Sequence, residues 1–400
     1  MVPVLGDKRA TLILLLILSS LIVNLPYVGI VKAEPNTIVV PDDYSTIQAV
    51  INAATQEDTI FVKKGTYYEK ITIDKSLLII GEDQKTTIID GGYNRTVVII
   101  TRNGVNVTGF TIRNGKQAGI PSFIPPPEPE AGIHLLSANY CNISENTITN
   151  NDYGIFLYYS SDNNIAGNNI TNSSYGIQLE SSSNNRLVAN NITNNTNGIK
   201  LEFSSNNIVD GNNITAQVYD GILLRNDCNY NSIVGNTITK NRDGIGVWTP
   251  SDFISILENT ISSNNNAGML LSNLHNSSII GNNITNNNIG IWLYTSSDII
   301  EFYNNNIINN TIQVNTFPDN GNSWDNGVQG NYWDDYIGVD NDGEGIGDTP
   351  YFIDENNQDN YPLISEFIIP EFPSWIILPI LVVSTLIVIS LRNKIRKKED

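Results

Sequence analysis

The sequence predicts an all-β protein, a single-stranded right-handed parallel β-helix with coils of about 22 residues. Three observations support this fold class. The residues after each repeat start alternate between apolar and variable, which indicates a strand with one buried face. A Gly-Ile pair, once Gly-Met, recurs every 22 to 24 residues, at Gly132, Gly154, Gly176, Gly198, Gly221, Gly244, Gly268 and Gly290. An Asn keeps pace with it, at Asn146, Asn168, Asn190, Asn212, Asn236, Asn259, Asn282 and Asn305.

These two columns exclude disorder and favour one structural unit per repeat, because a disordered segment does not hold a register over eight copies. In each copy a strand such as 154–158 is followed by a second short strand such as 169–171, and no copy has a helical pattern. A leucine-rich repeat is the alternative of similar length, but its Leu-x-x-Leu-x-Leu consensus is absent. We assign 59–320 to the β-helix, with regular Gly-Ile coils over 132–312.

The segment 34–58 is predicted to cap the open N-terminal end of the β-helix, since terminal repeats need a cover. Residues 45–48, Ser-Thr-Ile-Gln, match a capping box at the start of a helix. A short amphipathic helix is expected to begin there. Its apolar face, at i, i+3, i+4 and i+7, comprises Ile47, Val50, Ile51 and Ala54.

Both ends of the chain carry segments that direct it to a membrane. Residues 1–33 combine early positive charges, an apolar run and a small residue, which predicts a secretory signal peptide. Residues 374–391 are almost wholly apolar and predict a transmembrane helix, with a buried core helix as the alternative. The tail 392–400 is basic and therefore cytoplasmic, so the rest of the chain is expected outside. Between them, 321–365 is assigned to a C-terminal cap and 366–373 to a linker.

The charge balance limits the partners of the exported part. The formal net charge is −19, from 22 basic and 41 acidic residues. Such a field repels nucleic acid and acidic polysaccharides, and it favours cations and neutral sugars. The two cysteines, Cys141 and Cys228, fall in coils four apart, roughly 19 Å at the coil spacing. A disulfide needs Cα atoms within about 7 Å, so free thiols are expected.

The stretch VKKGTYYEKITIDKSLLIIGEDQKTTIIDGG (62–92), followed by the Gly-Ile coils, resembles the pectin-lyase-like β-helix superfamily. Within it the chain is most similar to NosD-type proteins, also described as carbohydrate-binding and sugar-hydrolysis (CASH) β-helix proteins. The C-terminal stretch 330–363 is typical of that group. PEFPSW (370–375) resembles archaeal PEF-CTERM sorting signals. This resemblance implies an archaeal surface protein and a sortase-type enzyme that replaces the tail with a lipid anchor.

The resemblance does not carry a chemical activity with it. The Gly-His-Gly and Asn-Thr-Asp motifs of polygalacturonases are absent, and the chain lacks the cations for a basic lyase groove. NosD itself is associated with copper-site maturation, which needs imidazole, thiolate or thioether ligands. His134 and His275 fall in coils six apart and cannot share a metal, so no copper site is expected.

The repeat register places an outward-facing stripe on the strand after each Gly-Ile pair. Aromatic rings there would stack on sugars, and charged groups would bind hydroxyls, which predicts a polysaccharide track of Tyr158, Arg225, Trp248, Trp292 and Tyr294. The alternative is that aromatic residues are simply favoured on sheets. The fourth residues past Gly are Tyr158, Glu180, Glu202, Arg225, Trp248, Ser272 and Tyr294. The second residues past Gly are Phe156, Gln178, Lys200, Leu223, Gly246, Leu270 and Trp292.

Two pairs of acidic residues stack in adjacent coils and are the catalytic candidates. Glu180 and Glu202 are expected near the roughly 5 Å separation used by retaining glycosidases. Asp220 and Asp243 both precede a Gly-Ile pair, with arginines close by. Like charges this near raise one pKa, as acid–base chemistry requires. A solvated acidic face is the alternative for both pairs.

A calcium loop is predicted in the C-terminal cap. Carboxylates stand at positions 1, 3, 5 and 9 and a carbonyl at position 7 of an EF-hand-like spacing. Position 12 is Tyr351, so another ligand such as Asp354 has to complete the shell. An acidic, Gly-rich turn without an ion is the alternative. The predicted calcium ligands are Asp340, Asp342, Glu344, Ile346 and Asp348.

Many asparagines lie in N-x-[ST] sequons, which mark exposed glycosylation acceptors in an exported protein. Asn94, Asn106 and Asn276 are the preferred candidates, because the other sequons recur with the repeat for structural reasons. Together these patterns predict an exported, membrane-anchored surface β-helix that binds glycans or builds the envelope without catalysis. A polysaccharide hydrolase or lyase acting along the outer face is the alternative, and a copper-maturation factor is less favoured.

Overall fold

The computed structural model describes residues 35–116, 129–295, 297–317 and 321–368, nearly all within one compact unit that begins at Thr37. The predicted signal peptide 1–33, the predicted membrane helix 374–391 and the sorting motif 370–375 lie outside these residues. Within the described ranges, no helix has the length and apolar character needed to cross a membrane.

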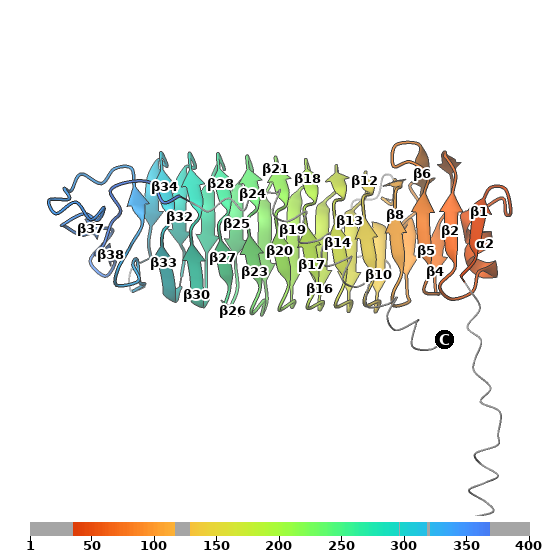
Figure 1. The fold of residues 1–400 in the computed structure, drawn as a ribbon, viewed down its shortest axis with the longest axis horizontal. Coiled ribbons are helices and arrows are strands. Elements are labelled where there is room, and N and C mark those ends of the chain that lie inside the picture. The colour runs from red at the N-terminus through yellow and green to blue at the C-terminus, as the bar shows by residue number, and fades with distance from the viewer. Residues whose placement is uncertain (1–34, 117–128, 296, 318–320, 369–400) are drawn as a thin grey trace, which may run out of the picture. The chain divides into compact units, whose positions relative to one another are not determined.

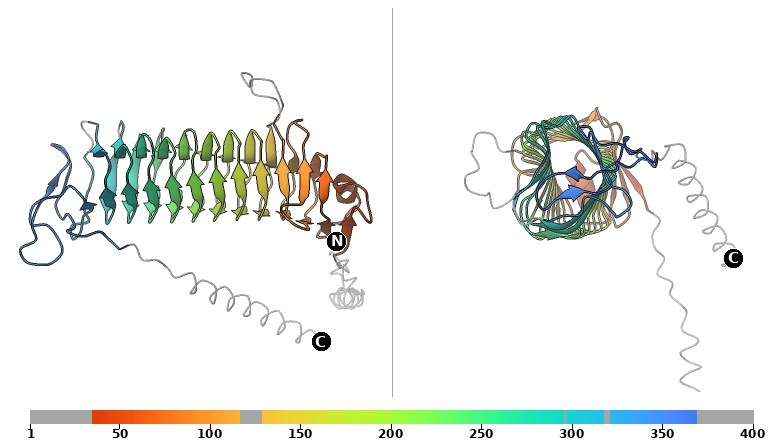
Figure 2. Two further views of the ribbon diagram at one scale, coloured as in Figure 1. Left: turned by 90° about the horizontal axis from the view of Figure 1, so that it is seen from above. Right: turned by 90° about the vertical axis from the view of Figure 1, so that its left-hand side faces the viewer.

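The predicted β-helix is confirmed. Successive coils stack along one axis, and each regular coil contributes one strand to each of three parallel sheets, as Figure 1 shows. Seen end-on, the coils superimpose, so the same position in each coil forms a column along the axis (Figure 2).

Sheet C holds the Gly-Ile strands and has 11 members. Strands β10 to β22 are six residues long. Two residues of each strand, the second and the fourth after the repeated Gly, lie on the face that has the candidate site. The members are β4 (Ile71–Ile73), β7 (Val98–Ile100), β10 (Ala131–Leu136), β13 (Tyr153–Tyr158), β16 (Tyr175–Glu180), β19 (Asn197–Glu202), β22 (Asp220–Arg225), β25 (Asp243–Val247), β29 (Ala267–Leu271), β32 (Ile289–Leu293) and β35 (Ile312–Asn315).

Sheet A follows sheet C in each coil and has 13 members. Its first strand, β1, already lies in the predicted cap segment 34–58 and pairs with β2. The members are β1 (Thr37–Val40), β2 (Thr59–Val62), β5 (Leu78–Gly81), β8 (Asn106–Thr108), β11 (Asn142–Ser144), β14 (Asn164–Ala166), β17 (Arg186–Val188), β20 (Ile208–Asp210), β23 (Ser232–Val234), β26 (Ser251–Asp252), β27 (Ser255–Leu257), β30 (Leu274–Ile280) and β33 (Asp298–Tyr303).

Sheet B completes each coil with short strands of the Asn-Ile-Thr type and has 12 members. A separate antiparallel pair, β37 (Tyr351–Phe352) and β38 (Gln358–Asp359), lies in the C-terminal cap. The members of sheet B are β3 (Gly65–Tyr67), β6 (Thr87–Asp90), β9 (Thr111–Arg113), β12 (Thr147–Thr149), β15 (Asn169–Thr171), β18 (Asn191–Thr193), β21 (Asn213–Thr215), β24 (Thr237–Thr239), β28 (Thr260–Ser262), β31 (Asn283–Thr285), β34 (Asn306–Ile308) and β36 (Tyr332–Trp333).

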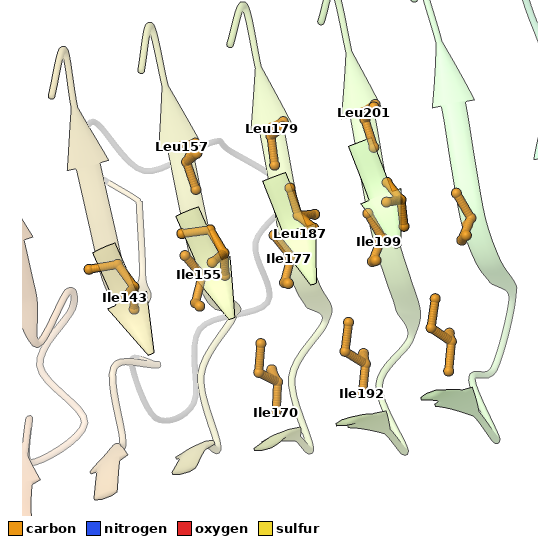
Figure 3. Packing of buried hydrophobic residues seen from close by; sticks show 14 of the residues in the cluster. Ile143, Ile155, Leu157, Ile170, Ile177, Leu179, Leu187, Ile192, Ile199 and Leu201 are labelled. Carbon is orange, nitrogen blue, oxygen red and sulfur yellow. The ribbon is translucent and has the colours of Figure 1, made fainter. Parts of the chain in front are cut away.

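The interior is filled by stacked branched aliphatic side chains. Ile155, Ile177 and Ile199 form one such column, and the column of Leu157 runs beside it (Figure 3). The repeated Gly is needed because the backbones of adjacent coils approach closely there. A Cβ on Gly244 would lie 2.4 Å from the carbonyl oxygen of Gly268 in the next coil. No side chain fits in that gap.

The main asparagine ladder is confirmed. From Asn146 to Asn305 each side-chain N–H donates to the side-chain oxygen of the next Asn, at 2.9–3.2 Å. The ladder continues through Asn331 and ends on the buried carboxylate of Asp359, which also accepts from the Trp333 indole N–H at 2.9 Å. Burial raises the pKa of Asp359 to about 6, and these hydrogen bonds oppose the shift.

Two further ladders support the other corners. A second ladder, in the corner between sheets C and A, runs from Asn163 to Asn231 with hydrogen bonds of 3.0–3.1 Å. A third ladder, in the corner between sheets B and C, runs from Asn195 through Gln217 to Asn310. Because Gln217 interrupts its run of asparagines, sequence analysis did not identify it. Buried side-chain amides therefore stabilise all three corners of the solenoid, continuously in the main ladder and over part of its length in the other two.

Helix α2 (Ile47–Ala53) covers the N-terminal end, as predicted, and buries Ile47, Val50 and Ile51. The capping box is wrong in detail. The N-cap is Thr46 rather than Ser45, and its hydroxyl accepts from Ala49 N at 3.2 Å. Gln48 does not complete the box, because its amide pairs with Thr72 in the adjacent coil. The Glu69 carboxylate instead accepts from the first two helix N–H groups, each at 3.0 Å.

The cysteines are free thiols, as predicted, and both are buried. In its coil, Cys141 occupies the position that Asn163 has in the next coil of the second ladder. The Cys141 backbone N–H donates to Asn163 Oδ1 at 2.8 Å. Burial raises the pKa of the Cys228 thiol to about 11. Neither thiol is therefore set up as a nucleophile or a metal ligand at neutral pH.

Candidate functional site

The strand register brings both predicted carboxylate pairs together. Glu180 on β16 lies opposite Glu202 on β19, and Asp220 on β22 lies opposite Asp243 on β25. Opposite positions in neighbouring parallel strands are about 4.8 Å apart. All four residues belong to sheet C, near the middle of the solenoid (Figure 1).

The predicted stripe, however, is a groove rather than a uniformly exposed surface. The second residues past Gly are mostly buried, with exposed fractions between 3% and 9%. They lie opposite one another in neighbouring coils, at the coil spacing. Ser272, in the fourth column, is also buried. These buried residues form the floor, and they are Phe156, Gln178, Lys200, Leu223 and Leu270.

Two adjoining clefts form the open part of this groove. One has a volume of about 350 Å³ and the other about 240 Å³, and both are bordered by Arg242 and Trp248. The first is lined by Asn197, Tyr219, Asp220, Leu223, Arg225, Arg242 and Trp248. The second is lined by Arg242, Trp248, Asn266, Leu270, Trp292 and Tyr294.

Asp220 is the most perturbed acid in this groove. Its side chain is buried above Gly246, and a Cβ on that glycine would lie 2.6 Å from Asp220 Oδ1 and 3.0 Å from Trp248 Nε1. Gly246 therefore leaves a hollow that the carboxylate occupies. Oδ1 makes no hydrogen bond of good geometry to any described residue. Such a group prefers to be protonated or to bind a ligand donor.

Burial raises the pKa of Asp220 to about 7, and the neighbouring charge of Asp243 adds to the shift. The Arg242 guanidinium and the Trp248 indole N–H oppose it. Near neutral pH this carboxyl therefore exists in both protonated and ionised forms. That is the condition under which a carboxyl can act as a general acid or base.

Asp243 is held more firmly than its neighbour. Its Oδ1 accepts from Asn266 Nδ2 at 2.6 Å and from Ala267 N at 3.1 Å. Its Oδ2 lies 3.7 Å from Arg242 Nε. Burial raises its pKa, and the hydrogen bond from Asn266 and the charge of Arg242 oppose that rise. The two stacked aspartates thus differ, since Asp243 Oδ1 accepts two hydrogen bonds and Asp220 Oδ1 has no such partner.

The Glu180 and Glu202 pair is less suited to chemistry. Lys200 Nζ binds Glu202 Oε2 at 2.6 Å, and Asn226 Nδ2 donates to Glu202 Oε1 at 3.0 Å. Both oxygens of Glu202 are therefore occupied by the protein itself. Burial and then the charge of Glu202 raise the pKa of Glu180. Neither glutamate lines the two clefts.

Four of the five predicted glycan-binding residues border the clefts, namely Arg225, Trp248, Trp292 and Tyr294. Trp292 and Tyr294 meet edge to face, with ring centroids 5.7 Å apart. Tyr158 does not border them. Its ring lies instead in a stack at the N-terminal part of sheet C, 5.9 Å from Phe156.

Sequence analysis missed Tyr219, which borders the larger cleft. Arg242 lies over its ring, 5.9 Å from the centroid. Tyr219 and Arg242 occupy the position just before the aspartate of their coils. The corresponding residues in other coils are small and polar, for example Ser174 and Thr196. An aromatic residue in an otherwise polar column was the signal available in the sequence.

In the cap, the carboxylate oxygens of Asp340, Asp342 and Asp348 lie within 4.8 Å of one another. Asp340 also accepts from Gly343 N and Gly345 N at 2.7 and 2.8 Å, which closes the loop. Ile346 is bridged to Leu363, which ties the loop to the cap.

Two further acidic residues proposed for the calcium shell do not join this group. Glu344 is exposed and lies outside the cluster of three carboxylates. Asp354, proposed to complete the shell, also lies outside the cluster. Its carboxylate accepts instead from Asn356 N at 2.8 Å and from the Asn357 side chain at 2.9 Å, both within its own turn.

The residues proposed for glycosylation differ in accessibility. Asn94 and Asn276 are exposed, and Asn276 lies in a corner with φ 50°. Asn106 is half-buried within β8, where its backbone pairs with neighbouring strands. The two exposed residues therefore remain the better predicted acceptors.

The described residues do not fit a copper site. His134, on β10 of sheet C, and His275, on β30 of sheet A, lie six coils apart, roughly 29 Å at the coil spacing. The one cluster of possible metal ligands within the described ranges is the carboxylate group in the cap. Carboxylates suit calcium or magnesium rather than copper.

Comparisons with known proteins agree with the fold. The Dettilon tailspike protein (gp208) is 15% identical with a TM-score of 0.57, and the match covers 74% of this chain and 66% of the tailspike. The A-module of the Azotobacter vinelandii mannuronan C-5 epimerase AlgE4 is 16% identical with a TM-score of 0.54, over 70% of this chain and 95% of the module. Both likenesses concern the right-handed parallel β-helix alone. No curated protein sequence matches the chain. A family model described as "Periplasmic copper-binding protein (NosD)" matches residues 51–243 and 217–338, more than half of the sequence, and the chain therefore belongs to the NosD family.

Proposed function

We propose that this chain is an exported, membrane-anchored surface protein whose groove on sheet C binds a polysaccharide. The observation that carries this proposal is the pair of adjoining clefts, in which rings alternate with charged and amide side chains. The rings of Tyr219, Trp248 and Trp292 offer flat apolar faces for sugars. Asp220, Arg242 and Asn266 offer donors and acceptors for hydroxyls. Export and anchoring rest on the sequence of 1–33 and 374–391.

The preferred ligand class is a neutral glycan. The chain carries a net charge of −19, which disfavours long anionic polymers. An open groove running across several coils suits a polymer better than a small molecule, because a polymer can contact successive coils. Many weak contacts along one chain then add up to useful affinity.

The test is a glycan array followed by titration calorimetry with the best ligand. Replacing Trp248 by Ala is expected to weaken binding at least about tenfold, since aromatic side chains in a cleft dominate binding energy. The matched control is Tyr68→Ala, which removes an exposed ring just before β4, several coils away from the two clefts. Equal affinity of Trp248→Ala and wild type would reject the groove as the binding site.

A second candidate function, polysaccharide cleavage, is favoured by the aspartate pair. Asp220 titrates near pH 7 and lies one coil from Asp243, close to the spacing of retaining glycosidases. In this hypothesis protonated Asp220 donates its proton to the glycosidic oxygen. Ionised Asp243 then acts as the nucleophile or base on the opposite side of the bond.

Reducing-sugar and unsaturated-product assays on the bound glycan separate the two functions. If the groove is catalytic, Asp220→Asn and Asp243→Asn abolish turnover, while Glu180→Gln retains it because that pair lies outside the clefts. Binding by wild type without any product supports the non-catalytic function instead.

We also propose that Asp340, Asp342 and Asp348 bind calcium in the cap, with the Ile346 carbonyl as a fourth ligand. The three clustered carboxylates support this, and oxygen ligands at such a loop suit calcium. Calorimetry with CaCl₂ is expected to show one site that Asp342→Asn weakens, while Asp354→Asn leaves it. No heat of binding in wild type would reject the site.

Intact mass of the native protein tests glycosylation at Asn94 and Asn276.

A further inference from the structure

One of the three corners of the solenoid carries large apolar side chains on strained backbone. In the corner between sheets C and A, each regular coil has one to three residues in the left-handed region. Six of these residues are aromatic or Ile, with φ between 47° and 57° and exposed fractions between 45% and 67%. We name them the apolar ridge: Tyr140, Tyr159, Phe203, Tyr230, Phe253 and Ile299.

The other two corners of the same coils have no such residues. Left-handed φ is unfavourable for bulky side chains, and Asn, Asp and Gly adopt it most readily. The corner between sheets A and B has Glu145, Gly167, Ala189, Gly211, Gly235, Glu258, Gly281 and Asn304 in this conformation. The corner between sheets B and C has Asn114, Asn150, Asn172, Asn194, Ala216, Lys240, Ser263, Asn286 and Asn309.

The fold itself does not require rings on the ridge. At the position of Tyr140, Tyr230, Phe253 and Ile299, other coils have Asp162, Asn184, Asn206 and Asn276, with the same sign of φ. At the position of Tyr159 and Phe203, other coils have Ser137, Ser181 and Asn273, again with the same sign of φ. The ridge residues therefore combine backbone strain with exposed apolar surface, and both features disfavour the isolated protein. Strain and exposed apolar surface kept together mark a place where an external partner makes contact.

The best-formed part of the ridge belongs to the two coils that hold the aspartate pair. Tyr230 follows β22, which begins at Asp220, and Phe253 follows β25, which begins at Asp243. Their rings are parallel within 4°, with centroids 4.8 Å apart, so they form one flat platform. Arg225 and Trp248, which border the groove, lie a few residues before them in the same coils.

The groups around the platform define the partner chemistry. Asp227 and Asp252 precede Tyr230 and Phe253, and no Lys or Arg lies within 226–239. This acidic surrounding disfavours anionic polymers and anionic lipid surfaces. A neutral polysaccharide, with apolar ring faces and uncharged hydroxyls, satisfies both the platform and its polar border.

We propose that the apolar ridge is a second binding surface for the same polysaccharide, and that the glycan passes from the groove over Arg225 and Trp248 onto the Tyr230 and Phe253 rings. This inference rests on the proposed glycan-binding function of the groove. It adds that affinity increases with chain length, because only a longer oligosaccharide contacts both surfaces at once.

The experiment replaces the platform with the residue that the corner uses elsewhere. In Tyr230→Asn/Phe253→Asn the backbone keeps a conformation that Asn adopts readily, so the melting temperature is expected to stay within a few degrees of wild type. Affinity for a long oligosaccharide is expected to fall about tenfold, whereas affinity for a short one changes little. The matched control is Ala189→Asn/Ala216→Asn, in the other two corners at φ 52° and 60°, with no effect on either ligand.

The outcomes separate the ridge from the groove. If Trp248→Ala loses binding while the double Asn variant binds long and short glycans like wild type, the ridge proposal is overturned and the groove stands. If the double variant alone loses affinity, the groove is wrong and the ridge stands. A wild type that binds no glycan rejects both. Sedimentation that shows self-association abolished in the double variant overturns the ridge as a glycan surface and makes it an interface between copies.

Discussion

The main asparagine ladder of the solenoid has the same residue in successive coils, whereas the outer face of sheet C has different ones. In the main ladder every coil from Asn146 to Asn305 has the same side chain with the same partners. On the outer face of sheet C the corresponding positions differ in nearly every coil, from Phe156 through Lys200 to Gly246. Residues that hold adjacent coils together have to recur, because each coil meets the same neighbour. Positions that diverge are free of that demand, so they are where a ligand site can develop.

The largest expected effect comes from breaking the repeating part. Asn190 donates to Ile165 O at 2.8 Å, and its side-chain oxygen accepts from Asn168 N at 3.0 Å. Replacing Asn190 by Ala leaves these buried backbone groups unpaired, at about 1–3 kcal/mol each. We expect a loss of roughly 2–6 kcal/mol of unfolding free energy, measured by urea denaturation.

The adjacent Asn191 provides the control. Its side chain is exposed on the surface of sheet B, where it donates to Asn169 Oδ1 at 2.9 Å and accepts from Asn213 Nδ2 at 2.8 Å. Asn191→Ala is expected to change stability by less than about 0.5 kcal/mol. If the two variants lose stability equally, the ladder is not the element that holds the coils together.

The next effect contrasts two buried carboxylates, one in each region. Asp220 in the groove has its pKa raised from 3.8 to about 7, and Asp359 at the end of the ladder has its pKa raised to about 6. A raised pKa of an acid means that the folded state binds the proton more tightly. The stability from this proton is complete below about pH 4 and is lost as pH rises through the folded pKa. For Asp220 the loss is up to about 4 kcal/mol.

The measurement is the unfolding free energy of wild type and Asp220→Asn between pH 4 and 8. As pH rises to about 7, the unfolding free energy of the variant is expected to increase relative to that of wild type. Asp359 contributes to the slope that remains below about pH 6 in the variant, and its four hydrogen bonds leave its pKa less raised than that of Asp220. Parallel curves would contradict an unusual proton affinity at Asp220.

The repeating part was largely predictable from the sequence. The 22–24 residue period fixes which residues stack, so the columns of Ile155 and of Asn168 followed from it. The ladder through Gln217 was not predicted, because one different residue interrupts a run of asparagines, although the Gln217 amide makes the same hydrogen bonds. The N-cap at Thr46 was not predicted, because Glu69, from a neighbouring coil, accepts the hydrogen bond of the first helix N–H group.

The groove was predictable only in part, since the register gives neighbours but not the direction of side chains. The two acidic pairs were paired correctly, because pairing depends on register alone. Their different environments depend on Lys200, which binds Glu202, and on the hollow that Gly246 leaves beside Asp220. The burial of the middle column likewise arises from side chains of adjacent coils, which no single strand reveals.

The smallest effect tests both regions on one strand. Gly244 and Gly246 are two residues apart on β25, one in the repeating Gly column and the other on the groove floor. A Cβ on Gly246 would meet only the ends of the Asp220 and Trp248 side chains, which can move. We expect Gly246→Ala to fold normally and to weaken glycan binding about tenfold, about 1.4 kcal/mol, by filling the hollow.

Gly244→Ala is the matched variant, because its Cβ would lie 2.4 Å from the backbone of the next coil. It is expected to lower the unfolding free energy by more than about 1 kcal/mol, since backbone cannot yield as a side chain does. Calorimetry and denaturation are done on both variants. Gly246→Ala is expected to lose glycan binding, and Gly244→Ala is expected to lose stability. If Gly246→Ala binds the glycan like wild type, the hollow beside Asp220 has no part in binding, and divergence on this face would need another explanation.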